Sequence, residues 1–479
     1  MMDIAYQPYI DPIYESLIER IHPPRVCIDN DTCQDCTIVK VDSANKHGIL
    51  LEMVQVLTDL DLVISKSYIS SDGGWLMDVF HVTDQLGNKL TDESLILYIQ
   101  QALCATRREN LSKEPLAKRD QFKSRHLSTK HTVLEMTGTD RPGLLSEISA
   151  TLTELECHIV AAVVWTHNGR TACVIYVKDE AKLGGPITDP EHLARIEEQL
   201  ENVVEAHHGR GERRSVRLTA PAAGRTHTER RLHQLMFTDK DYEQCGCHCE
   251  DSSRLQECPG PHISIEGWKE KGYSVVNIKS RDRPKLLFDT ICVLTDMEYV
   301  VSHAAVMSEG IMANQEYFIR HRDGCTLDGE CEKRKLTECL IAAIKRRVSH
   351  GLRLDVSTHN KRGLLSDVTR VIRESGLSIT RAEVRTQGER AIGSFYVTDA
   401  AGQEVDPGTV ELIRKEIGGS ALIVSKSSRW STPRLSSASS ISRSGSNSSI
   451  EDHKPRLSLG GLIWSKLERL SSNFSPIKL

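Results

Sequence analysis

The residues best suited to binding chemistry gather in four similar polar turns. The turns read NKHGILLE from Asn45, DRPGLLSE from Asp140, DRPKLLFD from Asp282 and NKRGLLSD from Asn360. Each begins with an acid or amide that can accept hydrogen bonds from an ammonium group, followed by a basic side chain that can face a carboxylate. The candidate ligand-binding residues are the polar and glycine positions of these turns: Asn45, Lys46, Gly48, Asp140, Arg141, Gly143, Asp282, Arg283, Asn360, Lys361 and Gly363.

The backbone of these turns adds to the side-chain chemistry, because each turn opens a predicted helix. The first N–H groups of a helix lack partners within it and attract anions, and glycine at Gly48, Gly143 and Gly363 lets a ligand approach the backbone closely. A structural interpretation stays open, since Asp and Asn commonly cap helices and Gly and Pro commonly form turns. The third turn departs most, with Lys285 in place of glycine.

Repeated strands and helices must position the turns. β-rich runs with alternating apolar residues precede them: TIVKVD from Thr37, TVLEMTG from Thr132, YSVVNIKS from Tyr273 and LRLDVST from Leu352. Helical spacing follows each turn, as in Leu145, Ile148 and Leu152. Two further strands and a second helical segment complete a split βαβ order of the ferredoxin-like type. The sequence therefore predicts an α+β fold of four ferredoxin-like βαββαβ modules with antiparallel sheets.

A final strand should complete each module. It is visible as ALIVSK from Ala421 in the fourth unit and as RSVRLTA from Arg214 in the second, but no such run is clear in the first and third. The third unit continues almost directly into the first strand of the fourth, so we expect these two sheets to share or pair edges. Open sheet edges promote aggregation, and side-by-side pairing of modules would remove them.

Length and composition set the domain plan. A chain of 479 residues is too long for one core, and a net charge of -5 gives no basic field for nucleic acid. No signal peptide or transmembrane segment is evident, so we expect a cytoplasmic and/or nuclear protein. The expected divisions are an N-terminal segment (1–36), four modules (37–108, 130–206, 273–348 and 350–426), a Cys-rich polar linker (207–271) and a disordered Ser-rich tail with a short amphipathic segment (427–479).

Motifs for other chemistry are absent or incomplete. The sequence contains no GxxxxGK[ST], GxGxxG or HExxH, so we predict no catalytic residues, no enzyme activity and no cofactor. One cluster could hold structural zinc or form an exposed redox-sensitive loop, and we assign no metal to it: Cys245, Cys247, Cys249 and Cys258 with His248 and His262. Cys33 and Cys36 form a CxxC, but no helix starts at Cys33, which argues against a thioredoxin-like role.

Taken together, the four turns in their strand-turn-helix context resemble ACT domains. Over about Thr37 to Lys426 the arrangement looks like the plant ACT domain repeat proteins, and the DRPGLL turn at Asp140 is its best-preserved element. The ACT modules at the end of bacterial uridylyltransferase nitrogen sensors carry the same turn. The resemblance implies a non-catalytic regulatory protein that binds a free amino acid between paired modules, near the loop from the first strand to the first helix.

An alternative function is a protein-interaction scaffold whose repeats have lost their ligands. It is motivated by the departures at Lys285 and His47 and by the apolar positions near the C-terminus. The expected partners are therefore an amino acid ligand, proteins that bind the ACT sheets or the tail, and a second copy of the chain. Neither nucleic acid nor a membrane-spanning segment is expected.

Overall fold

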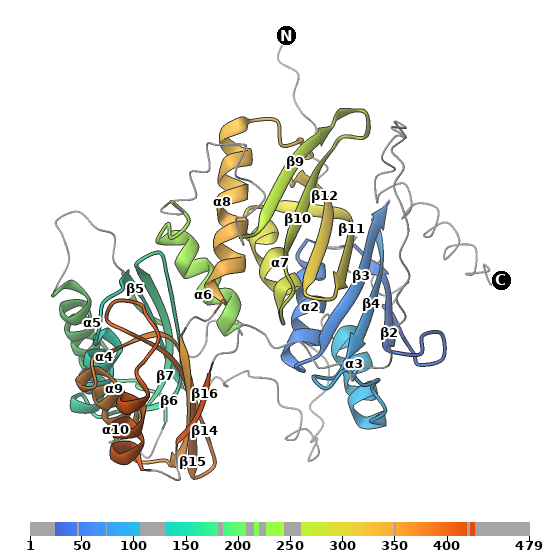
Figure 1. Cartoon of the computed structure of the whole chain (residues 1–479). Coiled ribbons are helices and arrows are strands. Elements are labelled where there is room, and N and C mark those ends of the chain that lie inside the picture. Colours follow the sequence, from blue (N-terminus) through green and yellow to red (C-terminus); the bar gives the residue numbers. More distant parts are fainter. Residues whose placement is uncertain are drawn as a thin grey trace, which may run out of the picture.

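The computed structural model describes residues 24–45, 47–72, 74–105, 131–180, 185–206, 215–219, 227–243, 260–348, 351–418 and 422–426. Within these ranges the chain forms two eight-stranded sheets in which all hydrogen-bonded neighbours are antiparallel (Figure 1). Each sheet is built from two modules. The predicted α+β fold with side-by-side modules is confirmed.

The first sheet joins the first and third modules. Its strand order is β1 (Arg25–Asp29), β2 (Thr37–Ala44), β4 (Trp75–Thr83), β3 (Val63–Asp72), β11 (Tyr299–Glu309), β12 (Met312–His321), β10 (Tyr273–Arg281) and β9 (His262–Trp268). The helices of this pair are α2 (Ile49–Asp59), α3 (Glu93–Ala105), α7 (Leu286–Asp296) and α8 (Glu330–Arg346). The apolar faces of strands and helices share one hydrophobic core, in which Val39, Phe80 and Phe288 are fully buried.

The second sheet joins the second and fourth modules. Its strand order is β16 (Leu422–Lys426), β13 (Leu352–His359), β15 (Arg390–Asp399), β14 (Leu377–Gln387), β6 (Cys157–His167), β7 (Arg170–Asp179), β5 (Thr132–Thr139) and β8 (Ser215–Thr219). The helices of this pair are α4 (Leu144–Glu154), α5 (Pro190–Glu205), α9 (Leu364–Glu374) and α10 (Pro407–Ile417). A second core lies between these helices and the sheet.

We expected the sheets of the third and fourth modules to share or pair edges, and this prediction is wrong. The first module pairs with the third through β3 and β11, where Ser70 lies opposite His303, and the second pairs with the fourth through β6 and β14, where Trp165 lies opposite Arg381. The edges beside the junction of the third and fourth modules are already occupied. Strand β9 covers β10 and strand β16 covers β13, so neither can accept another strand.

The outer edge strands come from two directions along the chain. The second and fourth modules use the strands β8 and β16, which follow the second helix as predicted. The first and third modules instead use β1 and β9, which precede the first strand of the module and lie in the predicted N-terminal segment and linker. This outer position of the sheet is therefore filled in all four modules, either by a strand that precedes the module or by a strand that follows its second helix.

The helix α6 (Thr228–Thr238) joins the two sheets. Its apolar residues Leu232, Leu235 and Met236 form a cluster with Trp165 and Tyr176 on the face of the second sheet opposite its own helices. It also contacts α7, and α8 contacts β6 (Figure 1). The helices α6 and α8 therefore lie between the two module pairs and hold them together.

A glycine just before β13 gives the first testable prediction. Gly351 has φ of +99°, and a Cβ there would lie 2.1 Å from the carbonyl oxygen of Val397, whereas Gly376 has φ of +73° and nothing within 4 Å of its Cβ. Gly376→Ala should lower the free energy of unfolding by about 1–2 kcal/mol, the cost of the left-handed backbone. Gly351→Ala adds a collision with backbone and should cost about 3 kcal/mol or more. Urea titrations of both variants check this, and equal losses would contradict it.

Candidate functional site

The four polar turns share one backbone geometry. The N–H of the first residue donates to a carbonyl at the tip of the module's own hairpin, over 2.7 Å from Asn45 to Gly74, 2.8 Å from Asp140 to Gly169, 2.9 Å from Asp282 to Ile311 and 2.7 Å from Asn360 to Glu389. The residue just before each helix is left-handed in all four, with φ of 83° at Gly48, 84° at Gly143, 64° at Lys285 and 69° at Gly363. Glycine adopts this conformation without strain, so Lys285 bears a cost that the other three avoid.

This geometry bears on the capping interpretation of the acid and amide side chains. The N-cap position is occupied by glycine or Lys285, three residues after Asp140 or its equivalents, and this N-cap residue makes no side-chain cap hydrogen bond. The acid or amide is therefore not placed as an N-cap in any of the four turns. Two of these side chains bond elsewhere, since Asn360 contacts His158 and Asp282 accepts from Ser308.

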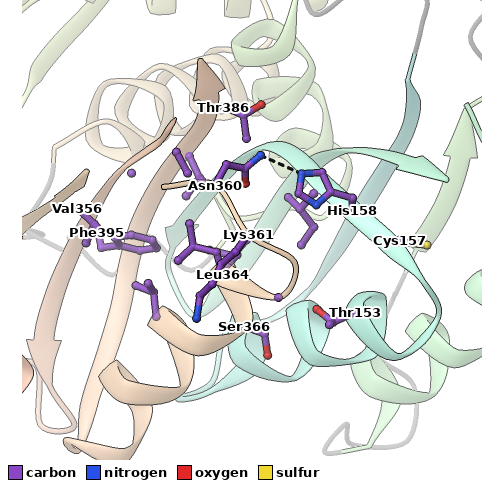
Figure 2. Close-up of a pocket in the computed structure, with 17 residues that line it drawn as sticks. Thr153, Cys157, His158, Val356, Asn360, Lys361, Leu364, Ser366, Thr386 and Phe395 are labelled. Carbon is purple, nitrogen blue, oxygen red and sulfur yellow. Dashed lines mark hydrogen bonds between the residues drawn. The ribbon is translucent and has the colours of Figure 1, made fainter. Parts of the chain in front are cut away.

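The turn of the fourth module forms one wall of a pocket at the boundary with the second module. Asn360, Lys361 and Gly363 line it from the turn, and Thr153 and His158 line it from the other module (Figure 2). Asn360 Nδ2 lies 3.2 Å from His158 Nε2, so the pocket bridges the two modules. Apolar residues complete the walls, namely Val356, Val384 and Phe395, around about 550 Å³ of space that includes the open mouth.

The turn of the second module forms a related pocket on the other side of the same boundary. Asp140, Arg141 and Gly143 line it from the turn, and Thr369 and Arg373 line it from the fourth module. A Cβ on Gly143 would lie 2.8 Å from Arg373 Cδ, just as a Cβ on Gly363 would lie 3.3 Å from Thr153 Cγ2. Each helix start is thus closely covered by the other module's helix.

A pseudo-twofold axis relates these two pockets. Near it, Ser149 Oγ and Thr369 Oγ1 lie 3.0 Å apart and are separated by 220 residues in the sequence. The pair lies on α4 and α9, which contact each other directly. The second and fourth modules therefore form a symmetric dimer within one chain, with one pocket on each side of the axis.

The basic residue in the second position of each of these two turns lies against an acid of its own module. Arg141 donates to the Glu147 carboxylate over 2.9 and 2.5 Å and to the Val203 carbonyl over 3.1 Å. Lys361 Nζ lies 2.7 Å from Asp367 on the exposed surface. These ion pairs hold the two basic side chains at the helix start.

The electrostatics of the two pockets differ. Burial raises the pKa of Asp140 to about 6, partly countered by the Arg141 backbone N–H. Asp140 is therefore largely ionised at neutral pH and would gain from a nearby cation. In the other pocket Asn360 is uncharged, and burial lowers the pKa of His158, which favours its neutral form at pH 7. The second-module pocket thus holds a carboxylate where the fourth-module pocket holds a neutral amide, and Arg141 and Arg373 line it as well.

The basic side chains of the third turn are engaged in ion pairs within the chain. Arg283 lies 2.7 Å from Asp289, and Lys285 Nζ lies 2.7 Å from Glu229 on α6. Burial raises the pKa of Asp282, whose carboxylate also accepts from Ser308.

In the first turn, Asn45 is exposed and a Cβ on Gly48 would have nothing within 4 Å, while Lys46 lies outside the described residues. The structure therefore places the second and fourth turns at the boundary of one module pair, whereas the first and third turns belong to the other pair.

Several pocket residues were missed by reasoning from the turns. Thr153, His158, Thr369 and Arg373 all come from the opposite module. No local pattern marks them, because their role depends on which modules pair. Across the described ranges, no three His, Cys, Asp or Glu side chains gather as metal ligands, and the cysteines at positions 245, 247, 249 and 258 lie outside those ranges. None of the described helices has the length and apolar character needed to cross a bilayer.

Paired ferredoxin-like modules with a polar turn facing the partner module define a protein built from ACT domains. Family models agree: an ACR family N-terminal ACT domain matches residues 32–110, and ACT domain models match 130–208 and 353–418. The chain is 54% identical to the Arabidopsis thaliana ACT domain-containing protein ACR1 over 488 aligned residues, covering 100% of both chains. It is 52% identical to ACR3 of the same plant, over 88% of this chain and 91% of the relative.

A bacterial relative matches a single region. The bifunctional uridylyltransferase/uridylyl-removing enzyme of Azospirillum brasilense is 38% identical over 81 residues, which are 17% of this chain and 9% of the enzyme. The match over the whole length is with the plant proteins. The chain therefore belongs to the ACR family of regulatory ACT-domain proteins.

Proposed function

We propose that this protein is a non-catalytic sensor that binds free amino acids in the two pockets between its second and fourth modules. The observation that carries the proposal is the repeated geometry of these pockets, in which a polar turn and a helix start from one module face a helix and strand of the other. A small zwitterion needs acceptors for its ammonium and donors for its carboxylate, and both are present at this boundary.

Recognition follows from the chemistry of the walls. The carboxamide oxygen of Asn360 would accept from the ammonium, and the first backbone N–H groups of α9 would face the carboxylate with the positive end of the helix dipole. Val384 and Phe395 would pack against the ligand side chain. In the other pocket Asp140 replaces Asn360, so a carboxylate would accept from the ammonium, and Arg141 and Arg373 line the same pocket.

The position of the pockets supports a route for signalling. Each pocket is lined by both modules, so an occupant makes contacts that exist only while the modules are paired. A ligand that binds the paired state better shifts the population toward it. Binding should therefore tighten the contact of β6 with β14 and of α4 with α9, and this change would be the output of the sensor.

The third module is proposed to have a structural rather than a sensory role. Its turn carries Lys285 where the second and fourth turns carry glycine, and the ion pair of Lys285 with Glu229 of α6 would have to break to admit a ligand. The scaffold alternative draws on the apolar tail at 457–479, which lies outside the described residues. The two pockets are present in the described part of the chain, which favours ligand binding.

Asn360→Ala tests the proposed site. The variant removes a hydrogen bond to a charged group, so affinity for the amino acid should fall about 10- to 100-fold. Isothermal titration of the full chain measures the loss. Asn202→Ala, at an exposed position on α5, is the matched control and should bind like the unaltered protein. Unchanged affinity in Asn360→Ala, with an unaltered melting temperature, would argue against this pocket as the site.

A further inference from the structure

Two cysteines in the loop between β1 and β2 lie in contact. The Cys36 thiol donates to the sulfur of Cys33 over a Sγ–Sγ distance of 3.1 Å. Cys36 is buried, with 6% of its surface exposed, in a small cluster with Ile38 and Val79, while Cys33 is only partly buried at its margin. The pair therefore presents one sulfur to solvent and keeps the other beneath it.

The loop that carries the cysteines is fixed by hydrogen bonds. The Asp29 carboxylate accepts from the backbone N–H groups of Asp31 and Thr32, at 2.9 and 3.0 Å, and from Lys40 at 3.0 Å. At the other end the Thr37 hydroxyl donates to the Asn30 side chain over 2.6 Å. Because both ends of the loop are held, little conformational entropy remains to be lost when the two sulfurs react.

The two thiols are also electronically unlike. The hydrogen bond from Cys36 and the Asp35 backbone N–H lower the pKa of Cys33, whereas burial raises the pKa of Cys36 to about 11. A partly exposed thiol with a lowered pKa beside a buried second thiol is the arrangement typical of redox-sensitive cysteines. Exposed Cys325 and Cys331 have no second cysteine hydrogen-bonded in this way among the described residues.

We propose that Cys33 and Cys36 form a reversible redox site that exchanges with low-molecular-weight disulfides. The Cys33 thiolate attacks the disulfide RSSR, forming a Cys33–SR bond and releasing RS⁻. Cys36 then loses its proton and attacks the Cys33 sulfur, forming the intramolecular disulfide and releasing a second RS⁻. Overall the two protein thiols are oxidised and RSSR is reduced to two RSH. No helix begins at Cys33, so the pair acts as a modifiable site and not as an oxidoreductase centre.

This site is independent of the proposed amino-acid pockets, because it lies at the outer edge of the first sheet. Its oxidation would add a covalent link to the segment between β1 and β2. This segment also contacts the approach to α3, since the Thr37 hydroxyl accepts from the Leu90 N–H over 2.9 Å. The redox state of the first module would thus be a separate input to the protein.

The test uses the full chain in glutathione buffers, followed by acid quenching, alkylation and peptide mass spectrometry. We expect a Cys33–Cys36 disulfide that reduced glutathione reverses. Cys36→Ser should trap glutathione on Cys33, whereas Cys33→Ser should leave Cys36 unmodified or modified at least about tenfold more slowly, since its thiolate fraction is small. Cys331, an exposed single cysteine, reports background exchange.

Two outcomes would overturn the proposal. In the first, Cys33 and Cys36 of the unaltered protein both alkylate as thiols under conditions in which Cys331 carries glutathione. In the second, the trapped glutathione is found on Cys36 and not on Cys33. Mapping of the unaltered protein decides the first outcome even where a serine variant at the buried Cys36 fails to fold.

Discussion

Replacing Asp289 by asparagine should lower the free energy of unfolding by about 3–5 kcal/mol, because it leaves buried cations without their counter-charge. Asp289 is fully buried on α7 and lies 2.6 Å from Arg347, 2.7 Å from Arg283 and 2.8 Å from His233. Burial alone would raise the pKa of this carboxyl, but Arg347 and Arg283 outweigh it and hold the pKa well below its usual range. The carboxylate is thus charged at neutral pH.

The loss should also loosen the two sheets from one another. Arg347, just after α8, contacts Glu229 on α6 and lies over the ring of Trp165 on β6, 4.9 Å from the ring centroid. Arg346 bonds Asp241, which in turn contacts His167 at the end of β6. The network around Asp289 therefore links helices of the first module pair to the second sheet.

The fourth module supplies a matched control for this prediction. Asp367 is the acid of the first turn of α9, as Asp289 is of α7, but 46% of its side chain is exposed where it pairs with Lys361. Asp367→Asn should change stability by less than about 1 kcal/mol, because water screens an exposed pair. Urea unfolding of both variants gives the comparison. Similar small losses at the two positions would show that the buried network does not hold the sheets together.

Asp78→Asn should have the opposite sign and stabilise the protein, by several kcal/mol at pH 8. Asp78 points into the core from β4 with 1% of its surface exposed, and neither carboxylate oxygen makes a hydrogen bond of normal geometry. Burial raises its pKa to about 8, with only a small opposing effect from the Ser70 backbone N–H. Gln315 occupies the same place in the third module, between the first and second strands, where its amide oxygen accepts from the Tyr317 hydroxyl; Phe80 takes the place of this tyrosine in the first module.

The pH dependence of this effect has a definite direction. The folded protein keeps Asp78 protonated up to pH 8, whereas the unfolded chain releases the proton near the ordinary pKa of 3.8. The penalty for folding is therefore absent below that value, grows by about 1.4 kcal/mol per pH unit and levels off above pH 8.

The advantage of Asp78→Asn should accordingly shrink from pH 8 towards pH 5. Urea titrations of this variant, of the unaltered protein and of Asp42→Asn, at an exposed position on β2, measure it. A constant difference across this range, or a loss of stability at pH 8, would refute the assignment of Asp78 as a buried neutral acid.

The sequence predicted the modules well because each is defined by local patterns. Alternating apolar residues mark the strands, and the shared turn marks the start of the first helix in each unit. The pairing of β3 with β11 and of β6 with β14 was not predictable in this way, because it depends on surfaces more than 200 residues apart in the sequence. The helix α6 was also missed, since its apolar face at Leu232, Leu235 and Met236 lies within a strongly charged stretch.

The candidate site, too, was predictable from the sequence only where local motifs mark it. The turns at Asp140 and Asn360 were visible as repeated motifs, and the structure places both at pockets. The opposite walls at His158 and Arg373 become evident only once the second and fourth modules are seen together. The third turn carried a signal, Lys285 in place of glycine, and the structure shows this lysine bound to Glu229.

The central claim is that the paired second and fourth modules bind a free amino acid. Calorimetric titration of the purified full chain with each standard amino acid, alongside its melting temperature, tests this most directly. We predict saturable heat with at least one of them and a stabilisation of about 2.7 kcal/mol when that ligand is present at 100 times its Kd. Absence of heat with every amino acid, together with an unchanged melting temperature, would contradict the claim.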